Sequence, residues 1–284
     1  MIKMTGVSYC VSNNPADLNE WTIRLLNEIE DIAKSGSDVI VYPELFLMSL
    51  DDYFTEDNFN KKLEKISNYI TEFLLPQIED RFKSTGILLV LGTGPIKRGP
   101  DIFNSCPIFV NGDWIFQNKI YLTPWENCFK CGEEIKIFEF KKMKTAVSVC
   151  FDIEQPFLSQ KLKEEKIDLL ICPSATINRN GNQRVNRCAS ARSVELGAVV
   201  LAVPVIGNSN CDLIDHNEGR QGFFLPAQED IIIDQEQFSI YSLNDHVIQS
   251  YEFDEGLIFS LKKITHETKP FLKSDPLKLK TVRL

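Results

Sequence analysis

Apolar side chains recur along the chain with two spacings, one typical of helices and one typical of short buried strands. Residues 17–34 carry apolar side chains at helical spacing, namely Leu18, Trp21, Leu25, Ile29 and Ile32. The same spacing predicts a second amphipathic helix over Leu63, Ile66, Ile70, Phe73 and Leu74. Residues 38–42 and 86–91 are short β-rich runs bounded by Gly or Pro, which predict strands. Strands that alternate with helices indicate the α/β class.

The run at residues 38–43 has a counterpart at residues 168–173, and each follows a charged helical segment, begins with Asp and ends with Pro. A further strand is predicted at residues 198–203, after a helix for which Gly197 is the expected C-cap. Two such half-units could pack sheet against sheet with helices outside. Short buried strands often look alike, so the repeat by itself is weak evidence.

Length and composition agree with a single large domain. The chain has 284 residues, of which 43% are hydrophobic and 25% charged, and no Pro/Gly/Ser-rich linker divides it. We therefore expect one domain over residues 1–265, followed by a basic tail at residues 266–284. This tail sets Lys269, Lys273, Lys278, Lys280 and Arg283 against an otherwise acidic chain.

The net charge limits the class of partner. A formal charge of −9 repels nucleic acid and anionic membranes, so neither is expected as the principal partner. No run approaches the roughly 18 apolar residues that span a bilayer, and the first residues lack the apolar core of a signal peptide. The prediction is a cytoplasmic protein.

Eight cysteines raise the question of disulfides or a metal. Without a secretory signal, reduced thiols are the better interpretation for a chain of this length. Cys128 and Cys131 have metal-ligand spacing, but there is no second such pair and the nearest histidine is His216. Two thiols in a loop are therefore favoured over a zinc site, and neither a metal nor a cofactor is expected.

Three residues whose side chains could take part in catalysis each follow an apolar or aromatic run. Glu44 follows residues 38–43, Lys119 follows residues 114–118, and Cys150 follows residues 145–149. Taken alone, each has an ordinary interpretation: a core cysteine, a solvated acid and a surface amine. Together they are more informative, because the ends of strands in α/β proteins are where sites are built.

This pattern resembles the nitrilase superfamily of carbon-nitrogen hydrolases, whose members carry a Glu, Lys, Cys triad in this order at comparable strand ends. The matching segments are Pro43-Glu44, residues 119–126 and residues 149–152, and the resemblance covers nearly the whole chain. It implies a four-layer αββα sandwich, a homodimer or higher homo-oligomer, and a small-molecule amide as substrate. In the second segment, Glu126 matches an additional active-site glutamate of many members.

The resemblance also implies roles. Glu44 would accept the proton of the Cys150 thiol, because a neutral thiol is a poor nucleophile near pH 7. Lys119 would stabilise the oxyanion, with the backbone N–H of Phe151 as a second donor. Glu126 would orient the substrate or the lysine. The loop after Pro173 would line the pocket, so Thr176 and Arg179 are candidate substrate-binding residues. Arg179 could bind a substrate carboxylate, or it could be a solvated loop residue.

Departures from the family pattern concern the substrate. Glu154 stands where many amidase-type members have arginine, and residues 219–226 are a divergent version of a Gly-Ser strand and turn. The Phe151-Asp152 pair resembles the amidase and carbamoylase branches rather than true nitrilases, which favours an amide over a nitrile.

The amino-acid sequence alone leaves several alternatives open. The histidines His216, His246 and His266 lie outside the strand-end motifs, so a Cys-His dyad has no sequence support. Nitrile hydrolysis, acyl transfer from Cys150 to an amine, and a noncatalytic binding or scaffold protein that keeps the fold are the competing functions.

Overall fold

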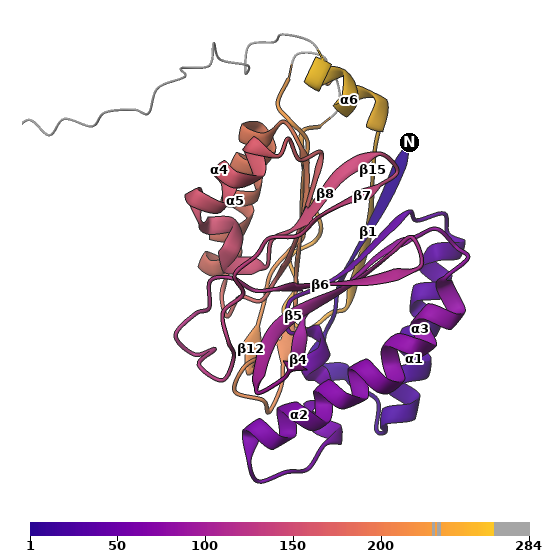
Figure 1. The fold of residues 1–284 in the computed structure, drawn as a ribbon, viewed down its shortest axis with the longest axis vertical. Helices are drawn as coiled ribbons and strands as arrows, with labels where there is room; N and C mark the ends of the chain where they lie inside the picture. Colours follow the sequence, from indigo (N-terminus) through magenta and orange to yellow (C-terminus); the bar gives the residue numbers. More distant parts are fainter. Residues whose placement is uncertain (229–230, 232–233, 264–284) are drawn as a thin grey trace, which may run out of the picture.

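The computed structural model describes residues 1–228, 231 and 234–263. The basic tail predicted at residues 266–284 and His266 lie outside these described residues. The described part of the chain folds as two β-sheets packed face to face, with helices on both outer sides (Figure 1).

The first sheet has the strand order β15-β1-β2-β3-β5-β4, and β6 pairs with β5. β1 runs parallel to β2, and β2 runs parallel to β3, while the remaining pairs are antiparallel. Its strands are β1 (Ile2–Ser8), β2 (Val39–Tyr42), β3 (Leu88–Leu91), β4 (Gly94–Arg98), β5 (Asp101–Val110), β6 (Asp113–Asn118) and β15 (Val247–Phe253).

The second sheet has the order β14-β13-β10-β9-β8-β7, with a parallel centre formed by β8, β9 and β10. Its strands are β7 (Ile137–Phe140), β8 (Met143–Val147), β9 (Leu169–Ser174), β10 (Val199–Pro204), β13 (Gly222–Phe224) and β14 (Glu236–Phe238). A separate small ladder joins β11 (Gly207–Asn208) to β12 (His216–Asn217).

The helices form the outer layers. On one side lie α1 (Leu18–Lys34), α2 (Phe59–Tyr69) and α3 (Leu75–Phe82), and on the other lie α4 (Pro156–Glu164) and α5 (Arg179–Leu196) (Figure 1). The last described helix is α6 (Glu255–Lys263), where Glu255 pairs with the Met1 amino group. The α/β class and the four-layer order predicted from the sequence are confirmed.

Alternation within the first sheet explains the layers. In β2, Val39 and Val41 face the core between the sheets, while Ile40 and Tyr42 face the core beneath α1 to α3. Successive side chains of a strand point to opposite faces, so a run that is apolar throughout covers two cores at once. The repeat noted at residues 38–43 and 168–173 corresponds to β2 and β9, which lie in different sheets and contact each other.

The helix predictions hold at most positions. Asp17 caps α1 by accepting from the Glu20 backbone N–H, and Gly197 ends α5 in the left-handed conformation with φ of 60°. Phe73 was placed on a buried helix face, and this was wrong, because its side chain is 58% exposed. A π-helical turn, η3 (Ile70–Leu74), inserts there and shifts the register, so that Leu74 and Leu75 are buried instead.

Candidate active site

The strand-end residues predicted from the sequence meet at one junction between the two sheets. Glu44 follows β2 and Lys119 follows β6 in the first sheet, whereas Cys150 follows β8 in the second. All three line one pocket of about 290 Å³, together with Glu126. The acid and the amine therefore come from one sheet and the thiol from the other.

Lys119 lies at the centre of the group. Its Nζ donates to Glu44 Oε1 at 2.7 Å and to Glu126 Oε2 at 2.6 Å. All three side chains are at most 2% exposed. A buried ammonium is tolerated only when it is paired, and here two carboxylates hold it in one position.

Asn104 on β5 completes this arrangement and was missed by sequence reasoning. Its Nδ2 donates to Glu44 Oε1 at 3.2 Å and to Glu126 Oε1 at 2.8 Å. Its backbone carbonyl oxygen accepts from the Lys119 backbone N–H. One signal was available, since Asn104 is a buried polar residue within an otherwise mainly apolar strand. Thr123 also fixes Glu126, by donating from both its N–H and its hydroxyl to Oε2.

The turn after β2 holds Glu44 in place. Leu45 has a positive φ of 56°, and its N–H donates to Thr93 Oγ1 at 2.8 Å. The neighbouring Gly92 has φ of 66°, and a Cβ at this position would lie 2.1 Å from the Pro43 carbonyl oxygen. Only glycine permits this close approach, which keeps the loop after β3 against the Glu44 turn.

Cys150 begins the 3-10 helix η4 (Cys150–Glu154) with a positive φ of 46°. Its Sγ donates to the Ala175 carbonyl at 3.4 Å, and the thiol also lies within hydrogen-bonding reach of Glu44. A non-glycine residue in the left-handed region is uncommon and clusters at functional positions. The turn presents the thiol to the pocket while the side chain stays 6% exposed.

The electrostatics differ for the two carboxylates on Lys119. Burial raises the pKa of Glu44 above its ordinary value, and the negative charge of Glu126 raises it further. The positive charge of Lys119 lowers this pKa but does not cancel the rise. Burial also acts on Glu126, but Lys119 and Thr123 outweigh it and hold its pKa below the ordinary value. For Lys119 the carboxylates and Cys150 outweigh burial, so its pKa is raised and it stays charged. Burial and the Glu44 charge raise the pKa of Cys150 well above that of a free thiol.

Asp152 connects the loops of Cys150 and Lys119. In the sequence it belongs to the Phe151-Asp152 pair, which by itself indicated no role for Asp152 in the site. Its carboxylate accepts from the backbone N–H of Tyr121 at 2.7 Å and from that of Ile120 at 3.2 Å. Burial raises the pKa of Asp152 to about 7. The turn that presents the thiol is thus tied to the segment that follows the lysine.

Some of the predicted substrate-binding residues line the pocket and one does not. Phe151 and Thr176 line the pocket, and the Thr176 hydroxyl donates to the Glu218 carbonyl at 3.2 Å. Arg179 is not among the lining residues, and its guanidinium lies over the Tyr241 ring, 5.6 Å from the centroid. The arginine in the pocket wall is Arg184, five residues further along α5. Five residues rotate about 140° around a helix, which places the two side chains on different faces.

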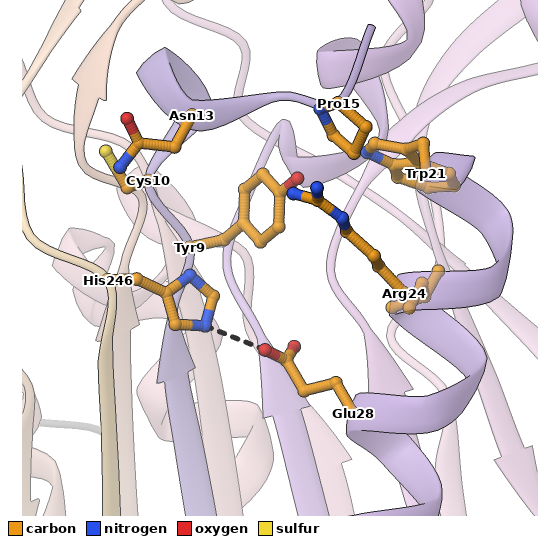
Figure 2. A pocket seen from close by; sticks show the side chains of 9 residues that line it. Tyr9, Cys10, Asn13, Pro15, Trp21, Arg24, Glu28 and His246 are labelled. Atoms are coloured by element: carbon orange, nitrogen blue, oxygen red, sulfur yellow. Dashed lines mark ion pairs between the residues drawn. The ribbon is translucent and has the colours of Figure 1, made fainter. Parts of the chain in front are cut away.

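The histidines are engaged elsewhere. His246 lies in a separate pocket, where its Nε2 pairs with Glu28 at 2.9 Å and its ring meets Tyr9 edge-on (Figure 2). His216 Nδ1 contacts Asn208 Oδ1 at 2.6 Å. Neither lines the pocket that holds Cys150, so within the described residues a Cys-His dyad has no geometric support.

Metal binding finds no support either. All eight cysteines are free, with Cys128 half-buried and Cys131 exposed. In the part of the chain that the structure describes, no third His, Cys, Asp or Glu joins them in a group suited to a metal ion.

The described helices include none with the length and hydropathy to cross a bilayer.

Comparison with known proteins decides the family. Residues 7–230 match the family model described as carbon-nitrogen hydrolase, which is most of the chain.

The chain belongs to the carbon-nitrogen hydrolase family.

Among curated relatives, this carbon-nitrogen hydrolase is 26% identical over 210 residues to the probable hydrolase YhcX of Bacillus subtilis, covering 71% of this chain and 41% of that protein. It is 27% identical over 166 residues to the omega-amidase NIT2 of Danio rerio, covering 52% of this chain and 54% of that protein. The chain thus spans about half the length of the curated relatives it matches.

Solved structures show the same fold. Nit3 of Saccharomyces cerevisiae, a member of the nitrilase superfamily, aligns over 96% of both chains with a TM-score of 0.67 and 21% identity. An amidase from Nesterenkonia sp. aligns over 92% of this chain and 95% of its own, with a TM-score of 0.67 and 17% identity. The nitrilase-like sandwich and the superfamily membership predicted from the sequence are confirmed.

Proposed function

We propose that this carbon-nitrogen hydrolase cleaves a small amide through a thioester on Cys150. The observation that carries the proposal is the ammonium of Lys119, held at 2.7 and 2.6 Å between Glu44 and Glu126 in the pocket that also contains the thiol. A fixed positive charge, an acid with a raised pKa and a nucleophile are the groups that acyl transfer needs.

The first half of the reaction forms the thioester. Because its pKa is raised, Cys150 is a neutral thiol at rest, so Glu44 takes its proton as sulfur attacks the amide carbon. The carbonyl oxygen becomes an oxyanion, which Lys119 and the Phe151 N–H stabilise. Collapse of this intermediate breaks the C-N bond, and the protonated Glu44 returns the proton to the leaving ammonia or amine.

The second half regenerates the enzyme. A water molecule gives a proton to Glu44 and attacks the thioester carbon, and the same donors stabilise the second oxyanion. The C-S bond then breaks, the carboxylic acid leaves, and Cys150 recovers its proton. Glu126 stays ionised throughout because its pKa is lowered, and it holds Lys119 in position.

Relatives support an amide as the substrate. Several curated relatives are omega-amidases, and a variant of the Nesterenkonia amidase has been solved in complex with the amide butyramide. The Phe151-Asp152 sequence after the nucleophile agrees with this choice. Assembly as a homo-oligomer in the cytoplasm remains part of the proposal.

The test is incubation with a panel of small amides, carbamoyl compounds and nitriles, followed by ammonia assay and intact-protein mass. The wild type should release ammonia and show an acyl adduct, and Cys150→Ala should do neither. Cys131→Ala, which removes an exposed thiol away from the pocket, is the matched control and should retain activity. Undiminished turnover by Cys150→Ala would refute the proposal.

A further inference from the structure

The pocket that holds Cys150 also carries an ion pair separate from the Lys119 group. Arg184 Nε on α5 donates to Glu154 Oε2 at 2.8 Å, and both side chains line the pocket. Glu154 ends the 3-10 helix that Cys150 begins, so the acid and the nucleophile are held by the same turn. The pair is accessible, with Glu154 11% and Arg184 62% exposed.

The two groups of charges in this pocket differ in how far they are satisfied. Lys119, Glu44, Glu126 and Asn104 hydrogen-bond one another and are almost fully buried. For the side chains of Glu154 and Arg184, the bond from Nε is the single hydrogen bond found within the described residues. The terminal amino groups of the guanidinium and Oε1 of the carboxylate therefore remain available to a ligand.

The pair discriminates among ligands by charge. An amide that bears only a carboxylate at its far end would meet Arg184 but also the like charge of Glu154. An amide that bears only an ammonium would be attracted by Glu154 but repelled by the like charge of Arg184. A far end that carries both groups gives each side chain an opposite charge, and charge-assisted hydrogen bonds are stronger than neutral ones.

The geometry points to a substrate whose end away from the amide is a zwitterion, with its ammonium on Glu154 and its carboxylate on Arg184. This inference rests on the proposed function and names the substrate class: a free amino acid that carries the amide on its side chain. A pocket of about 290 Å³ lies at the small end of ligand sites, which limits the substrate to a short chain.

Binding to the Cys150→Ala variant tests the inference without turnover. Four amides of equal chain length are compared by calorimetry: one with both charged groups, one with the carboxylate only, one with the ammonium only, and one with neither. The zwitterion should bind about tenfold or more tightly than each of the others, which corresponds to one charge-assisted hydrogen bond. Equal binding of a singly charged or neutral amide would overturn the inference.

Variants in the same background assign each contact. Arg184→Gln should remove the advantage given by the carboxylate, and Glu154→Gln the advantage given by the ammonium. Arg187→Gln, an exposed arginine on the same helix outside the pocket, is the control and should bind as before. The double reversal of Glu154→Arg with Arg184→Glu should recover part of the zwitterion affinity that each single reversal loses, and no recovery would count against the pair.

Turnover separates this inference from the function on which it rests. If the zwitterion binds best to Cys150→Ala but the wild type releases no ammonia from it, the proposed function fails and the recognition site stands. If the wild type hydrolyses all four amides with equal kcat/KM, the hydrolase stands and the inference fails.

Discussion

Glu44 and Glu126 accept hydrogen bonds from the same Lys119 ammonium, yet their pKa values move in opposite directions. The pKa of Glu44 is raised and that of Glu126 is lowered. Thr123 supplies two further donors to Glu126, whereas Glu44 faces the Cys150 thiol. Opposite pKa shifts of two neighbouring acids are typical of a division of roles, and they support the base and the positioning group of the proposed mechanism.

Replacing each acid by its amide should reveal this division. Glu44→Gln removes the proton acceptor and should lower kcat by roughly 100-fold or more. Glu126→Gln keeps a polar group beside Lys119 and should cost less. Steady-state ammonia release under saturating amide measures both. A larger loss for Glu126→Gln than for Glu44→Gln would reverse the assignment.

The acid limb of the pH profile should report Glu44. In the proposed mechanism activity needs the carboxylate of Glu44. Because its pKa is raised, kcat/KM should fall at a pH above the ordinary value of 4.5 as the group becomes protonated. Since the Glu126 charge contributes to the raised pKa, Glu126→Gln should move this limb to lower pH. A limb that does not move in that variant would show that another group is being titrated.

Lys119→Met should separate charge from packing. Methionine keeps an unbranched apolar stem but gives no donor to the oxyanion, so kcat should fall by about 10² to 10³. Breaking a buried ion pair also leaves uncompensated charge and should lower the free energy of unfolding by about 3 to 5 kcal/mol. Urea unfolding and single-turnover kinetics measure the two effects. Turnover within tenfold of the wild type would remove Lys119 from the oxyanion role.

Asn104→Asp should be damaging although it is nearly isosteric. The donor that bridges Glu44 and Glu126 becomes a third carboxylate around a single ammonium. Loss of a buried bridging donor alone is worth about 1 to 3 kcal/mol. The free energy of unfolding at neutral pH should therefore drop, and the drop should shrink as the pH is lowered and the added acid is protonated. A pH-independent loss would contradict the electrostatic explanation.

Asp152 should give stability a distinct pH dependence. Burial raises its pKa from the ordinary 3.8 to about 7, so over this interval the folded protein holds a proton that the unfolded chain has lost. The resulting contribution is fully present below the lower value and is lost as the pH rises through the upper one, with a slope of up to about 1.4 kcal/mol per pH unit. Asp152→Asn should lack it. Parallel stability profiles for wild type and variant would disprove this titration.

The amino-acid sequence was enough to predict the class of fold and to place Glu44, Lys119 and Cys150 at the ends of strands. The apolar runs that precede Glu44, Lys119 and Cys150 are local patterns, and a local pattern is enough to place each residue at a strand end. The capping positions Asp17 and Gly197 were readable for the same reason, because a helix end is satisfied by its immediate neighbours.

Tertiary structure decided how these residues meet. Glu44 and Lys119 come from one sheet and Cys150 from the other, so their contact depends on how the two sheets pack. Asn104 acquires its role only because β5 runs beside the turns that carry its partners, which no local pattern encodes. Which of Arg179 and Arg184 lines the pocket depends on the rotation of α5 against it. Local sequence fixes periodicity and strand ends, whereas contacts between distant segments depend on packing angles that are set by the whole core.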